Sequence, residues 1–245
     1  IFFKSMSLRV VTSSFVRTTC KRIRSAFPQQ HSSHMSTFSW TGPRALNDII
    51  KKELLVGKSA EELSSIWKHY HDDKESVYGL VYSGSEGQTF VKHAKESPFF
   101  IHPIFRDNGY FMLLSQFYHE NNVFLFCYLE DYKMDPAGAS PLMTCAVFND
   151  YASSKEEEND ANIVVVDDDE SLTDDDDNDE LLDLSLVRAE TLTSGISDDE
   201  SLQIVTNLRD LYLDKKDLVH LFNSNPEKFD VDDYISQQNQ SWKKG

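Results

Sequence analysis

The side chains that most often carry enzyme chemistry rarely fall at a useful spacing in this sequence of 245 residues. His69 and His71 are two residues apart in a stretch expected to be helical, so they point away from each other. Two histidines that share a metal ion on a helix need a spacing of about four residues. The sequence contains no HExxH, no GxSxG and no GxxxxGK[ST] phosphate loop. We therefore expect no catalytic residue, no metal site and no cofactor.

The cysteines are not spaced for redox chemistry. Cys20 lies in a basic N-terminal segment, and Cys127 and Cys145 lie in apolar stretches without a CxxC spacing. In a reducing compartment, two such thiols are expected to be buried and free rather than disulfide-bonded or nucleophilic.

One acidic stretch has the ligand type of a calcium site. Residues 153–180 contain 14 Asp or Glu side chains and a single cation, Lys155. An EF-hand loop needs alternating ligands, a central glycine and a closing glutamate, and this stretch has no glycine. A run of like charges repels itself and buries little apolar surface. The stretch is therefore predicted to be a solvated, disordered insertion rather than a metal site.

The first 40 residues differ in charge from the rest of the chain. They include six Lys or Arg side chains, no Asp or Glu, and many Ser and Thr among apolar residues. This composition is typical of an organellar transit peptide, and the frequent arginine and short length favour a mitochondrial one. A merely disordered basic tail is the alternative. The sequence begins at Ile1, so Met6 and Met35 are candidate starts, and a start at Met35 would delete the signal.

Composition limits the other classes of function. The formal net charge of −17 argues against nucleic acid as a partner, because phosphate neutralisation needs clustered Lys and Arg. No run reaches the roughly 18 apolar residues of a membrane-spanning helix, so we expect no membrane insertion. The length fits one globular domain with disordered additions. We place that domain at residues 41–236, interrupted by the insertion 153–180 and followed by a tail at 237–245, and we expect a monomer.

Helical periodicity predicts two main helices. A capping-box pattern begins at Ser59 and precedes an apolar stripe that should cover a sheet, formed by Leu63, Ile66, Trp67 and Tyr70. A second cap at Ser197 precedes a helix whose phase is set by Leu202, Val205, Leu208, Arg209 and Tyr212. Shorter helices are expected at 44–54, 87–96 and 217–222. Beyond them, Phe229 and Tyr234 are expected to fold back onto the body of the domain.

Between these helices the chain reads as strands. The turn signal Asn108-Gly109 predicts a hairpin, and further polar turns extend it into a meander. The expected strands are 99–105, 110–118, 123–129, 141–148 and 184–192, and 76–82 is either a strand or the tail of the preceding helix. The predicted fold class is α+β, with an antiparallel sheet of about six or seven strands and helices packed around it.

The strands 110–118 and 123–129 are apolar or aromatic on both faces. An antiparallel sheet with one solvated face should instead alternate apolar with polar residues. Two explanations remain open: the chain's own helices cover both faces, or one face is reserved for another protein.

Several short motifs follow one another along the chain. They are Trp67-Lys68-His69-Tyr70-His71 with Lys74, Pro103-Ile104-Phe105-Arg106, Gln116-Phe117, Leu129-Glu130-Asp131-Tyr132-Lys133, Pro141-Leu142, Val187-Arg188-Ala189-Glu190 and Phe222-Asn223-Ser224-Asn225-Pro226-Glu227-Lys228-Phe229. Taken in order, they resemble a family of mitochondrial assembly chaperones that bind the β subunit of the ATP synthase F₁ sector. The resemblance spans about residues 44–236 and depends on the order and spacing of the motifs rather than on any single one.

The resemblance implies a matrix-located binding protein without enzyme activity. Such a protein keeps unassembled F₁ β subunit soluble until the α subunit replaces it, without using ATP itself, and its fold is an antiparallel sheet surrounded by helices. The insertion 153–180 is longer and more acidic than the family pattern. A hydrolase or metal-binding protein that uses the His and Asp residues is the alternative, and the lack of nucleophile–base spacing disfavours it.

An unassembled β subunit exposes an interface more apolar than ordinary surface, which an apolar sheet face can mask. The predicted partner contacts come from the two doubly apolar strands, the Pro103–Arg106 run and the C-terminal segment. They are Arg106, Tyr110, Phe117, Tyr118, Phe124, Phe126, Tyr128, Phe222 and Phe229.

Overall fold

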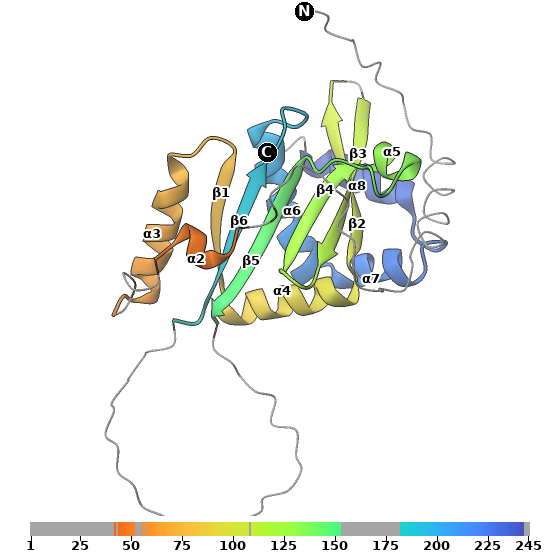
Figure 1. Cartoon of the computed structure of the whole chain (residues 1–245). Coiled ribbons are helices and arrows are strands. Elements are labelled where there is room, and N and C mark those ends of the chain that lie inside the picture. The colour runs from red at the N-terminus through yellow and green to blue at the C-terminus, as the bar shows by residue number, and fades with distance from the viewer. Residues whose placement is uncertain are drawn as a thin grey trace, which may run out of the picture.

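The computed structural model describes residues 42, 44–51, 55, 57–107, 109–152 and 182–242 (Figure 1). The basic segment 1–40 and the acidic insertion 153–180 lie outside the described residues. The predictions of a transit peptide and of a disordered insertion therefore remain predictions.

Six strands form one antiparallel sheet in the order β1-β6-β5-β4-β3-β2. They are β1 (Val77–Ser83), β2 (Phe99–Arg106), β3 (Gly109–Tyr118), β4 (Val123–Tyr128), β5 (Met143–Tyr151) and β6 (Leu184–Thr191). Strands β2 to β6 follow one another as a meander, and β1 pairs on the outer side of β6. The α+β class and the expected antiparallel sheet are confirmed, and the segment predicted at 76–82 forms the strand β1 rather than the tail of a helix.

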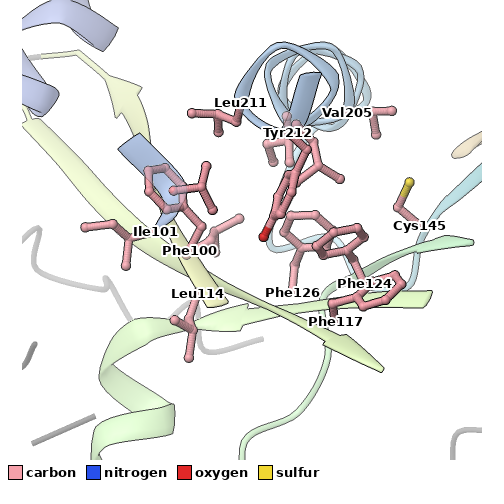
Figure 2. Packing of buried hydrophobic residues seen from close by; sticks show 14 of the residues in the cluster. Phe100, Ile101, Leu114, Phe117, Phe124, Phe126, Cys145, Val205, Leu211 and Tyr212 are labelled. Atoms are coloured by element: carbon pink, nitrogen blue, oxygen red, sulfur yellow. The ribbon is translucent and has the colours of Figure 1, made fainter. Parts of the chain in front are cut away.

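Four helices cover one face of the sheet: α4 (Gly84–Glu96), α6 (Asp198–Leu213), α7 (Lys216–Ser224) and α8 (Val231–Trp242). The main core lies between them and the strands. The ring of Phe124 packs against Phe90 of α4 and Tyr212 of α6, with ring centroids 5.7 and 5.2 Å apart. Figure 2 shows Tyr212 over Phe124 and Phe126, and Leu114 on the opposite side of the strands. Alternate residues of one strand therefore serve different layers.

The other face is covered in two places by α2 (Leu46–Ile49) with α3 (Ala60–Asp72), and by α5 (Leu129–Met134). Trp67 of α3 is fully buried with Leu46 and Leu186, and its Nε1–H donates to the carbonyl O of Val187 at 3.2 Å. Further along the chain, α5 packs on β3 and β4. The chain's own helices thus account for much of the two-sided apolar pattern.

The two predicted helix caps are confirmed, but the predicted buried face of α3 is wrong in part. The Ser59 side chain accepts from the Glu62 amide and closes the predicted capping box, and Ser197 does the same for α6. In α3, however, Ile66 and Tyr70 are 39% and 41% exposed. The buried row continues from Trp67 to His71, because α3 packs on β1 where Gly79 leaves room for that imidazole.

Other elements also differ from expectation. Arg106 pairs with Gly109, so the hairpin turn comes one residue earlier than predicted, and Asp107 takes the left-handed backbone with φ 48°. Leu129 begins α5 instead of ending β4. Helix α8 was not predicted, although Phe229 and Tyr234 pack on the body as expected.

Candidate partner-binding surface

One Ser–His pair has the residue types of a hydrolase site. Nε2 of His102 lies 2.9 Å from Oγ of Ser115 on the neighbouring strand. Both side chains are buried, and the rings of Phe100 and Phe126 pack against the imidazole. The Ser115 hydroxyl donates to the carbonyl O of Phe100 at 3.3 Å, so its proton already has an acceptor. This pair links β2 to β3 within the core and does not form an accessible nucleophile.

Burial of His102 makes folding depend on pH. Burial lowers the pKa of the imidazole to about 3, whereas an unfolded histidine titrates near about 6.5. Between these values the unfolded chain binds one more proton at this site, so stability falls as pH falls. We expect a contribution of up to about 1.4 kcal/mol per pH unit, measured by urea unfolding from pH 7 to pH 5.

His102→Gln should reduce that slope, because the substituted site no longer titrates. The matched control is His69→Gln on α3, an exposed position, which should keep the wild-type slope. An unchanged slope in His102→Gln would show that His102 does not contribute to it.

The two thiols of the sheet are free, as predicted. Cys145 pairs with Phe124 and Cys127 pairs with Leu114, which places the two sulfurs on opposite faces. Burial raises the pKa of each thiol to about 12, so neither is a ready nucleophile.

Among the described residues, no three His, Cys, Asp or Glu side chains converge as metal ligands would. Within those same ranges, no helix has both the length and the apolar character needed to cross a bilayer.

The nine predicted partner contacts fall into two groups. Five are buried in the main core between the sheet and its four helices, namely Phe117, Phe124, Phe126, Phe222 and Phe229. The other four, Arg106, Tyr110, Tyr118 and Tyr128, reach the surface at least in part. The structure does not bring the nine together, because strand alternation separates Tyr110 and Tyr118 from Tyr128.

Arg106 and Tyr128 hold the hairpin to the start of α6. The guanidinium of Arg106 donates from Nε and Nη2 to the two carboxylate oxygens of Glu200, both at 2.6 Å. Its Nη2 also donates to the carbonyl O of Gly195 at 2.9 Å, and the Tyr128 hydroxyl donates to the same oxygen at 3.3 Å. Burial acts to raise the pKa of Glu200, but the hydrogen bonds from Arg106 and the Ser197 amide outweigh it and lower that pKa.

Tyr118 lies on the other face, beside the part that α5 covers. It is 36% exposed, at the end of β3. Burial raises the pKa of Tyr132 on α5 to about 12, and Tyr118 and Cys127 are close enough to add to that shift. We call the partly exposed side chains around Tyr118 on this face the Tyr118 surface: Gln116, Tyr118, Leu125, Cys127 and Tyr132. It combines aromatic and aliphatic area with an amide and two hydroxyls.

A family model described as ATP11 protein matches residues 14–235. The chain belongs to the ATP11 protein family. A search among curated proteins found no match. The ATP11 family takes part in F₁-ATPase assembly and is a family of assembly factors rather than of enzymes. The resemblance inferred from the sequence motifs is thereby confirmed.

In this ATP11 chain, sequence reasoning missed Gln116, Leu125, Cys127 and Tyr132 as neighbours of Tyr118. The motif that contains Tyr132 was noted, but Leu129 was placed at the end of a strand and no element was predicted for residues 130–133. A signal was present: Leu129-Glu130-Asp131 places two acidic residues in a first helical turn, as a short helix after β4 would.

Proposed function

We propose that this chain is an assembly chaperone that binds unassembled F₁ β subunit and prevents its aggregation until the α subunit replaces it. The observation that carries the proposal is the ATP11 family match over residues 14–235, nearly the whole chain. The chaperone acts as a monomer and without nucleotide. The basic, acid-free segment 1–40 supports a location in the mitochondrial matrix.

Tyr118 is the accessible member of the predicted contact set that best fits such a client, together with the Tyr118 surface around it. Aromatic side chains give large contact area at low entropic cost and dominate many interfaces. Tyr118 sits on a sheet rather than on a loop, so little ordering is needed when a partner docks. The acidic residues that dominate the chain keep the remaining surface soluble and discourage self-association.

The chain should suppress aggregation of isolated F₁ β subunit without added nucleotide, and α subunit should release it. Tyr118→Ser should weaken β-subunit binding by about 1–3 kcal/mol, which is about 5- to 150-fold in Kd, as for other interface aromatics. Thermal stability should barely change, because the side chain is already 36% exposed. Light scattering reports aggregation, and calorimetric titration reports affinity.

Leu202→Ser is the control variant, because Leu202 is 45% exposed on α6, on the far side of the sheet. It should bind β subunit like the wild type. Aggregation of β subunit at an unchanged rate in the presence of wild-type chain would refute the proposed function. Equal affinities of wild type and Tyr118→Ser would leave that function in place but remove this surface from it.

A further inference from the structure

The two edge strands of the sheet, β2 and β1, differ in how their outward backbone groups are hydrogen-bonded. Pro98 and the even-numbered residues of β2 form the backbone hydrogen bonds to β3. The N–H and C=O groups of the odd-numbered residues of β2 therefore point away from the sheet. The side-chain amide of Asn223 accepts from the Phe99 N–H at 3.1 Å and donates to the Phe99 carbonyl at 2.7 Å. The Tyr234 hydroxyl donates to the Ile101 carbonyl at 3.0 Å. The next outward position is Pro103, which has no N–H to offer.

On edge β1, no side chain of the described residues bonds to the outward backbone groups in this way. The bonds from Thr191 N–H to the Ser76 carbonyl and from Gly84 N–H to the Asp183 carbonyl fix which residues face β6. By alternation, the N–H and C=O groups of Val77, Gly79 and Val81 point away from the sheet. None of these groups forms a hydrogen bond with any described residue. All three residues are partly exposed, although α3 packs on the same strand and the His71 side chain lies against Gly79.

An exposed edge of this kind is a template for pairing with another strand, and natural proteins usually block it. Here one edge is blocked by two side chains and a proline, whereas within the described ranges the outward backbone groups of the other, seven residues long, have no hydrogen-bond partner. Strand addition at such an edge gains affinity from main-chain hydrogen bonds and specificity from alternate side chains.

Charge indicates what the added strand carries. Asp72, Asp73 and Glu75 precede β1, and Asp198 accepts a hydrogen bond from Ser76 at 2.9 Å at the same end. Lys74 is the one cation among them, and it lies 3.9 Å from the centre of the Tyr70 ring. The Val77 end of the edge is therefore acidic and complements a cationic side chain.

We propose that β1 takes up an extended segment of the client as a seventh strand, apolar in its middle and carrying Lys or Arg beside Val77. The inference rests on the proposed function and adds to it a second contact, at the end of the sheet remote from Tyr118. The client's backbone forms hydrogen bonds with Val77, Gly79 and Val81, in the same way that β6 forms them with Tyr78 and Leu80.

Amide hydrogen exchange of the full chain, alone and with isolated F₁ β subunit, tests the proposal. In the free chain, the amides of Val77, Gly79 and Val81 should exchange fast, and those of Tyr78 and Leu80, bonded to β6, slowly. In the complex, amide exchange at Val77, Gly79 and Val81 should slow at least tenfold. A complex that forms while these amides stay fast overturns the inference and leaves the proposed function intact. Failure to form any complex overturns both.

Two variants test the same edge by affinity. Val81→Pro removes an outward N–H without breaking a bond to β6, and Val77→Lys places a cation where the client's own cation would lie. Each should raise the Kd for β subunit at least tenfold. Val81 also packs near Trp67, so Val81→Pro can unfold the chain. In that case Val77→Lys still tests the edge. Leu202→Lys is the control for added charge and should bind normally.

A second copy of the chain is the competing occupant of this edge. Slowing of the Val77, Gly79 and Val81 amides that grows with protein concentration, in the absence of β subunit, would assign the edge to self-association and overturn the proposal. Unchanged exchange on dilution, together with slowing on addition of β subunit, would support it.

Discussion

Replacing Phe124 by Ala is expected to lower the free energy of unfolding by about 3–5 kcal/mol, the usual cost of truncating a buried phenylalanine. Its side chain is fully buried at the centre of the main core. The ring packs against the rings of Phe90, Phe117 and Tyr212 at centroid distances of 5.7, 4.7 and 5.2 Å. Truncation leaves a cavity that strands on one side and helices on the other hold open. Urea unfolding measures the loss as a lower midpoint.

The control for this experiment is Leu202→Ala on α6, which removes exposed rather than buried area and should stay within about 0.5 kcal/mol of the wild type. A loss below about 1 kcal/mol for Phe124→Ala would mean that the surrounding core collapses into the space and is not closely packed. Client binding by folded Phe124→Ala should remain near that of the wild type, since the ring has no accessible surface.

Trp67→Ala should cost a similar amount, about 3–5 kcal/mol, on the opposite face of the sheet. The indole is fully buried against Leu46 and Leu186 and also donates the hydrogen bond to Val187. Removing the indole leaves a cavity between α3 and the strands β1 and β6. It also leaves His71 without the nearer of two ring neighbours, Trp67 at 4.4 Å and Tyr70 at 5.0 Å. Urea unfolding with far-ultraviolet circular dichroism as the probe follows the loss.

Two substitutions on the same helix sharpen the result. Trp67→Phe keeps most of the apolar area but loses the hydrogen bond, so it should cost less than Trp67→Ala. Ile66→Ala changes a side chain that is 39% exposed and should stay within about 0.5 kcal/mol of the wild type. If Ile66→Ala proved as destabilising as Trp67→Ala, the α3 face predicted from periodicity would be the true contact.

The features that the sequence predicted well have local causes. The caps at Ser59 and Ser197 join a side chain to a backbone amide three residues away, so the pattern is complete within one turn. The hairpin between β2 and β3 is equally local. Its turn was misplaced by one residue because Asp107 as well as glycine can adopt a positive φ.

The features that the sequence did not predict depend on distant contacts. Which side of α3 is buried follows from Gly79, where a side chain would meet the His71 imidazole. Periodicity alone cannot distinguish a row that ends at Tyr70 from one that ends at His71. In the same way, the pattern of 110–118 shows two apolar faces but not which helices cover them. Phe117 and Tyr118, adjacent in sequence, were therefore both predicted as partner contacts, although Phe117 is buried and Tyr118 reaches solvent.

The pairing of β1 with β6 also affects the order in which the sheet can form. Strands β2 to β5 find their partners through short connections, whereas Val77 pairs with Glu190, more than a hundred residues later in the chain. Contacts between distant residues form slowly because loop closure costs entropy. The insertion between β5 and β6 adds little, since doubling a loop costs only about 0.6 kcal/mol. A chain that emerges N-terminus first, from a ribosome or a translocation channel, must keep Val77–Ser83 unpaired until Leu184–Thr191 has followed it.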